Sequence, residues 1–214
     1  MILHPYNVEE FNFKSHFQKV FDCADLNNMH NKYNFKEIFT MENNSDTFLH
    51  DKFYDNMRND GHFVDLYENF INKYVTRLFR EEFVFQRMPT LRIHFADNWA
   101  TPEFHVDTQD GYFHPHGENN FILPLTTCFD TNSLWIETEP NRGDYRPVEM
   151  SYGNLFQFAG GTHRHGNKIN KTGFTRVSID FRVLPLSKYD PNFTKTSATK
   201  GVRFVVGEYY KELR

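Results

Sequence analysis

The stretch PTLRIHF, residues 89–95, marks the point where the hydrophobic pattern of the chain changes from helical to extended. Pro89 interrupts a helical pattern, and apolar residues then alternate with Arg92 and His94. A period of two is typical of a β-strand with one apolar and one polar face. If the apolar face is the core of a barrel, Arg92 and His94 point outwards. If the polar face lines a cavity, Arg92 becomes a candidate for binding an anionic group of a substrate.

Short strand candidates continue from here to about residue 186. They read FILPLT, SLWIET, PVEMSY, NLFQFA and TRVSIDFRVL, and turn sequences such as NRGDY and NKTG lie among them. Many short strands at this spacing predict a mainly β fold, a sandwich, jelly roll or barrel, and not a series of βαβ units.

The remainder of the chain divides into two parts. Residues 1–88 are predicted to be mainly helical, with an amphipathic helix from about Gly61 to Phe85 in which apolar residues recur every three or four positions. Residues 187–214 read as an irregular arm followed by a strand. No internal repeat or linker is evident, so we predict a single domain, 1–214, whose β core spans residues 89–186.

Composition excludes several classes of protein. The 214 residues carry a formal charge of −4, which gives no basic field for nucleic acid or an anionic membrane surface. No apolar run has the length of a membrane span and the N-terminus has no signal-peptide pattern, so we expect a cytoplasmic protein. The only two cysteines, Cys23 and Cys128, lie far apart, so any metal must be held by histidine and carboxylate. No pattern indicates an oligomeric state.

The stretch FHVDTQDGYFHPHGENNF, residues 104–121, contains a candidate for half of a metal site. On a strand, His105 and Asp107 point to the same face and can reach one metal ion. His-x-acid pairs also arise by chance, and the chain has a second one, His116-Gly117-Glu118. The alternative for His105 is a surface strand with a salt-linked histidine.

A second histidine cluster, GGTHRHGNK at residues 160–168, supplies a third ligand. A sandwich can bring the ends of distant strands together, and one histidine of this cluster would complete a facial triad of two histidines and one carboxylate with three open positions. His163 and His165 have the same strand parity, so alternation alone leaves both open.

Arg176 and Ser178 lie one strand step apart in TRVSIDFRV. A guanidinium binds a carboxylate through two parallel hydrogen bonds, and a neighbouring hydroxyl can add a third. The pair is a candidate anchor for a dicarboxylate cofactor. The alternative is a solvent-facing Arg-x-Ser.

Taken together, these motifs resemble the Fe(II)- and 2-oxoglutarate-dependent oxygenases, and within them the phytanoyl-CoA-dioxygenase-like branch and its streptomycin-biosynthesis-type members. The similar phrases are FHVD, GENNFILPLT, NSLWIETEPNRGDYRPVEMSYGNL, TRVSIDFRVLP and KGVRFVVGEYY, which fall in residues 86–210. The resemblance does not extend recognisably to the first 85 residues.

The resemblance implies a double-stranded β-helix, a jelly roll or cupin-like barrel. It also implies iron(II) held by His105, Asp107 and His165, because the alignment places the third ligand at His165 and not at His163. 2-Oxoglutarate would pair its far carboxylate with Arg176, assisted by Ser178. With O2 as co-substrate, the enzyme would oxidise, most simply hydroxylate, a small polar metabolite and release succinate and CO2.

Three further residues are candidates for contacts with the cofactor or the substrate. Asn120 is a candidate donor to 2-oxoglutarate or to a ligand carboxylate, with a turn-capping asparagine as the alternative. His114 and His116 lie where an active-site loop would contact substrate, or in a solvated loop without a role. Two other functions stay open: a cupin-type metal enzyme without 2-oxoglutarate, using His114, His116, Glu118 and His163, and a non-catalytic ligand-binding barrel.

Overall fold

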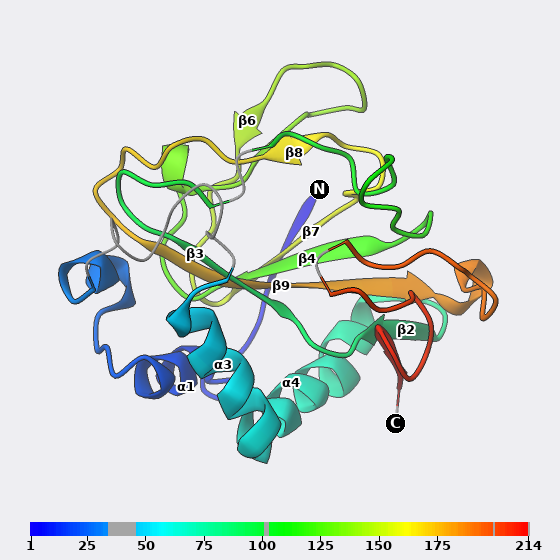
Figure 1. Ribbon diagram of the computed structural model, residues 1–214, viewed down its shortest axis with the longest axis horizontal. Coiled ribbons are helices and arrows are strands. Elements are labelled where there is room, and N and C mark those ends of the chain that lie inside the picture. Colours follow the sequence, from blue (N-terminus) through cyan, green and yellow to red (C-terminus); the bar gives the residue numbers. More distant parts are fainter. Residues whose placement is uncertain (34–45, 101–102, 199, 214) are drawn as a thin grey trace.

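The computed structural model describes residues 1–33, 46–100, 103–198 and 200–213, and it is built around antiparallel strands (Figure 1). The strands are β1 (Ile2–Pro5), β2 (Phe83–Gln86), β3 (Thr90–His94), β4 (Asn119–Pro124), β5 (Trp135–Ile136), β6 (Arg146–Pro147), β7 (Asn154–Phe158), β8 (His165–Gly166), β9 (Arg176–Pro185) and β10 (Tyr210–Glu212). A seven-stranded sheet has the order β1-β7-β4-β9-β2-β10, with β3 also paired to β9, and a three-stranded sheet has the order β6-β5-β8.

Helices precede most of the sheet in sequence. They are α1 (Phe13–Val20), α3 (Phe48–Asn59) and α4 (Gly61–Lys73), and the 3-10 helices are η1 (Leu26–Asn31), η2 (Val75–Leu78), η3 (Asp130–Asn132) and η4 (Leu186–Lys188). The part predicted to be mainly helical also contributes strands β1 and β2, and its residues 34–45 lie outside the described residues.

The predicted helix from Gly61 to Phe85 is wrong in its second half. Helix α4 begins where the side chain of Asp60 accepts a hydrogen bond from the His62 N–H, and it ends at Lys73. Residues 83–86 form β2 instead, and all four are buried between β9 and β10. Pairing on both edges and the preference of Phe and Val for strands override the helical spacing.

The two faces of strand β9 belong to different parts of the molecule, because one is apolar and the other is polar. One face carries Val177, Ile179, Phe181 and Val183, which belong to the main hydrophobic cluster. The other face carries Arg176, Ser178, Asp180 and Arg182, which all line a cavity. In the pairing of β3 with β9, Arg92 lies opposite Ser178 and His94 opposite Arg176. On the polar face of LRIHF, Arg92 therefore lines the cavity while His94 is fully buried, and the apolar face lies in the core.

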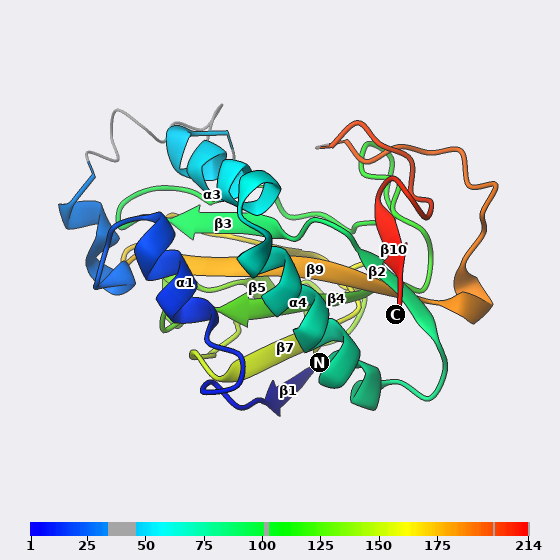
Figure 2. The same ribbon diagram turned by 90° about the horizontal axis from the view of Figure 1, so that it is seen from below.

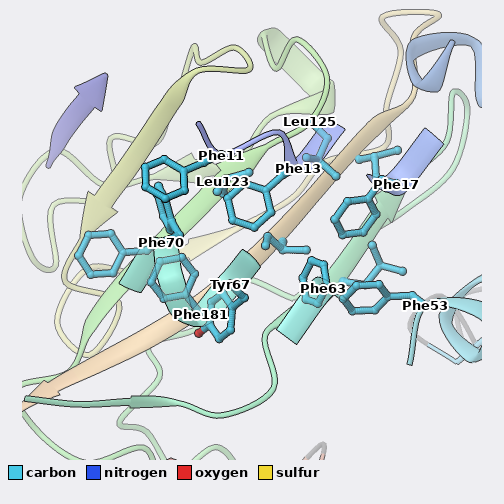
Figure 3. Packing of buried hydrophobic residues seen from close by; sticks show 14 of the residues in the cluster. Phe11, Phe13, Phe17, Phe53, Phe63, Tyr67, Phe70, Leu123, Leu125 and Phe181 are labelled. Atoms are coloured by element: carbon cyan, nitrogen blue, oxygen red, sulfur yellow. The ribbon is translucent and has the colours of Figure 1, made fainter. Parts of the chain in front are cut away.

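The main core lies between the large sheet and the helices that cover one of its faces (Figures 2 and 3). Tyr67 of α4 packs its ring at 5.5 Å from that of Phe181, and its hydroxyl donates to the carbonyl of Gln86 at 2.7 Å. Aromatic side chains fill this layer because each removes a large apolar area from water and packs edge-on to its neighbours. The opposite face of the sheet is thus left for a polar site.

None of the helices in the described part of the chain combines the length and apolarity that crossing a membrane requires.

Candidate metal centre and cavities

His105 and His165 lie side by side because their backbones pair. Each peptide N–H donates to the carbonyl of the other residue at 2.9 Å, which forms an isolated antiparallel bridge. The two imidazole centroids are 4.6 Å apart. This bridge joins the segment that contains the His-x-Asp pair to the start of β8.

Asp107 adds a carboxylate to this pair. Its Oδ1 lies 3.3 Å from His105 Nε2 and 3.6 Å from His165 Nε2. All three residues are buried, and their candidate ligand atoms lie within 4.8 Å of one another. Asp107 Oδ1 has no hydrogen-bond partner among the described residues, and a buried carboxylate oxygen without a partner is costly. Two imidazole nitrogens and one carboxylate oxygen that face a common point fit a divalent transition metal.

The orientation of both imidazoles is fixed by backbone carbonyls. His105 Nδ1 lies 3.0 Å from the carbonyl oxygen of Glu103, and His165 Nδ1 lies 2.9 Å from that of His163. A ring nitrogen that faces a carbonyl must carry the hydrogen, so Nε2 keeps its lone pair. Burial lowers the pKa of His165 to about 4, so this ring is neutral at pH 7 and able to bind a metal.

The second oxygen of Asp107 is held by two residues. Asn120 Nδ2 donates to Oδ2 at 2.6 Å, and Arg182 donates from Nε and Nη2 at 3.2 and 3.1 Å. Burial alone would raise the pKa of Asp107, but the Arg182 guanidinium and the neighbouring His105, His165 and His114 together outweigh burial and hold the pKa well below its usual range. Gly160 permits this arrangement, since a Cβ there would lie 2.6 Å from Asn120 Nδ2.

Beside this group lies the first cavity, which we call the inner cavity. It is lined by Arg92, His105, Asn120, Ile122, Leu134, Phe158, His165, Gly166, Asn167, Arg176, Ser178, Asp180 and Arg182. Arg176 is only 3% exposed. It forms no ion pair with any described carboxylate, and its Nε has no hydrogen-bond partner in that part of the chain. Burial lowers the pKa of Arg176 to about 10, so it stays charged at neutral pH. The cavity therefore presents an uncompensated cation with a hydroxyl, Ser178, beside it.

A second acidic group, Asp107, His114 and Glu118, brings its ligand atoms equally close together. Arg182 already pairs with both of its carboxylates, lying 3.1 Å from Asp107 and 3.6 Å from Glu118. His114 Nδ1 lies 2.8 Å from Glu118 Oε2, and the Tyr210 hydroxyl donates to Glu118 Oε1. This group is an ion-pair network that supports Asp107, and not a second metal site.

A second cavity, which we call the outer cavity, also adjoins the metal group. It is lined by Thr90, Arg92, His105, Asp107, Tyr112, His114, Arg182, Ser197, Ala198, Lys200 and Tyr209. Tyr112 stacks on the His105 ring with centroids 4.2 Å apart. The outer cavity and the inner cavity share Arg92, His105 and Arg182.

The structure brings most of the predicted site residues together and leaves two apart. His163 contacts Thr162 and the carbonyl of Ala159 and does not join the metal group. His116 is exposed and lines neither cavity. Because neither His163 nor His116 lies in the metal group, the ligand set of the cupin-type alternative does not assemble within the described residues.

Two residues of the site were missed in the sequence. Arg182 continues the alternation of Arg176, Ser178 and Asp180 along β9. The period of two therefore predicts that Arg182 lies on the same face as these residues. Lys200 lies in the C-terminal arm and reaches the outer cavity only through the fold of that arm. No local pattern predicts that contact.

Three buried histidines make the stability of the metal-free protein pH-dependent. Burial lowers the pKa of His50 to about 4, of His94 to about 3 and of His165 to about 4. Below pH ~6.5 the unfolded chain binds protons that the folded chain does not, so stability falls as the pH decreases. At about pH 5 each histidine is expected to cost about 2 kcal/mol relative to neutral pH. Urea denaturation at both pH values measures this, and equal free energies of unfolding would contradict it.

No family model matches the chain. Streptomycin biosynthesis protein StrG from Streptomyces griseus is 37% identical over 176 residues, which cover 81% of this chain and 80% of StrG. The chain belongs to the family of this protein. Among solved structures, CytC3 with Fe(II) and alpha-ketoglutarate aligns with a TM-score of 0.45 at 14% identity, covering 94% of this chain and 79% of CytC3. The non-heme monooxygenase ThoJ in its nickel complex aligns with a TM-score of 0.40 at 14% identity, covering 99% of this chain and 84% of ThoJ. Neither TM-score reaches 0.5, so function is inferred below from the residues of the site.

Proposed function

We propose that the protein is an Fe(II)- and 2-oxoglutarate-dependent oxygenase of the phytanoyl-CoA-dioxygenase-like branch, with its two sheets forming a double-stranded β-helix. One observation carries the proposal: two histidines and a carboxylate converge on one point beside a cavity that holds a buried arginine without a counter-ion. The two histidines and the carboxylate suit a facial iron(II) site with open positions. The buried arginine suits the far carboxylate of a dicarboxylate cofactor.

His105, Asp107 and His165 would hold the iron, and Arg176 with Ser178 would hold the distal carboxylate of 2-oxoglutarate. When bound, iron and 2-oxoglutarate supply the activation of O2, with release of succinate and CO2. Asn120 and Arg182 keep Asp107 ionised and oriented, which leaves Oδ1 directed at the metal position.

Two further features of the chain serve the reaction. Ile122, Leu134 and Phe158 form apolar walls of the inner cavity and exclude water from the cofactor side. The polar groups of the outer cavity, among them Thr90 and Ser197, share this space with His105 and Asp107 and would orient a polar substrate. A small metabolite agrees with the family relative, which is named for the biosynthesis of an antibiotic.

The test is an oxygen-consumption assay with quantification of succinate. Protein supplied with iron(II) and 2-oxoglutarate is expected to consume O2 and form succinate slowly without substrate, and faster when a hydroxylatable substrate is added. Heat-treated protein and protein without iron(II) are the controls. Binding of both iron(II) and 2-oxoglutarate without any succinate would identify a ligand-binding barrel instead.

A further inference from the structure

Lys200 lines two spaces, one of which adjoins the metal group. It lines the outer cavity together with Arg92 and Tyr209. The same three residues also line a larger hollow of about 520 Å³, whose wall includes Tyr54 and Arg58. The two spaces are therefore neighbours, and Lys200 belongs to the wall of both.

The charges around Lys200 leave it without a counter-ion. Arg182 is paired with Asp107, and Arg92 is paired with Asp180 at 2.7 Å. Lys200 Nζ donates to the carbonyl of Met88, and it forms no ion pair with a carboxylate of the described residues. Burial lowers the pKa of this amine to about 7; Asp180 opposes the change, and Arg182 and Arg92 add to it. A desolvated cation without a counter-ion is costly, and an anion brought by a ligand removes that cost.

We propose that Lys200, together with Arg92, binds an anionic group of the substrate, a phosphate or a carboxylate, in the outer cavity. The proposal rests on the proposed function, because it names the substrate class of the same site. Lys200 contacts neither the metal group nor the inner cavity, so it would take no part in holding the metal or the cofactor. Its role would be to determine which substrate binds. The anion would sit on the surface side of the metal, and the rest of the substrate would extend towards His105 and Asp107.

The test is a calorimetric titration of the full-length, metal-free protein near pH 6, where an amine with a pKa of about 7 is protonated. The probes are inorganic phosphate and acetate. We expect Lys200→Met to bind the effective probe at least about tenfold more weakly, which is about 1.4 kcal/mol. Lys195→Met is the matched control, since Lys195 is exposed on the same arm and lines neither cavity. It should bind as the unaltered protein does.

Two more variants separate this site from others. Arg176→Met removes the cation of the inner cavity that has no carboxylate partner among the described residues, and should leave anion binding at Lys200 intact. Lys200→Arg keeps the charge and should retain binding if Lys200→Met fails to fold. Binding of phosphate alone supports a phosphorylated substrate, and binding of acetate supports a carboxylate.

Equal binding by Lys200→Met and the unaltered protein, or no binding of either anion, would overturn the proposal. The titration needs neither iron nor O2, so its failure is distinct from failure of the oxygenase assay.

Discussion

The His165→Ala variant is expected to bind iron(II) more than about 100-fold more weakly than the unaltered protein. Losing only the partner that orients a metal ligand already costs ten- to 100-fold, and this change removes one of three protein ligands outright. The remaining pair, His105 and Asp107, would still face the site but would leave a further position to water. Anaerobic titration with iron(II), followed by calorimetry, measures the loss.

His163→Ala is the matched control, because His163 lies two residues before His165 and just outside β8. Its ring contacts Thr162 and the carbonyl of Ala159, and its removal should change iron(II) affinity by less than about twofold. Since the carbonyl of His163 orients the His165 ring, the backbone contact survives in this variant. The ligand assignment fails if the His163 variant is the one that loses iron.

The two His-x-acid pairs have the same spacing in the sequence but different backbone conformations. The rule that residues i and i+2 share a face holds only for extended backbone. His105 meets that condition through its bridge to His165, and Asp107 lies beside it. His116 and Glu118 flank Gly117, whose φ of +94° places the pair in a turn, so one side chain is exposed and the other buried. A single sequence does not distinguish these two backbones.

Strand β9 gave a stronger signal because it is long. The alternation from Arg176 to Val183 identifies one apolar and one polar face, and the cavity partners Arg176 and Ser178 follow from parity. Which histidine joins them depends on where β8 begins. His163 and His165 have equal parity, but only His165 lies on the strand. The position of Lys200 depends on how the arm folds back, a contact distant in sequence from both cavities, and no periodicity encodes it.

The Arg176→Met variant is expected to lose about 2 to 5 kcal/mol of 2-oxoglutarate binding, an affinity drop of roughly 30- to several thousand-fold. Arg176 is the buried cation of the inner cavity without a carboxylate partner in the described structure, so nothing in that cavity replaces its two parallel hydrogen bonds. Titration of the iron-loaded protein with 2-oxoglutarate under anaerobic conditions gives the affinity. Iron(II) affinity itself should stay unchanged, because Arg176 does not contact the metal group.

The melting temperature of the Arg176→Met variant distinguishes a ligand-binding role of Arg176 from a structural one. An unpaired buried guanidinium is costly in the ligand-free protein, so replacing it with an apolar side chain of similar length should leave the melting temperature unchanged or raise it. Arg142→Met serves as the control, since Arg142 is exposed and its ion pairs in the described part of the chain are with Glu139 and Asp144. A destabilised Arg176→Met protein with normal 2-oxoglutarate affinity would show that Arg176 supports the fold. A stable protein that needs far more 2-oxoglutarate would show that the arginine is kept for its ligand.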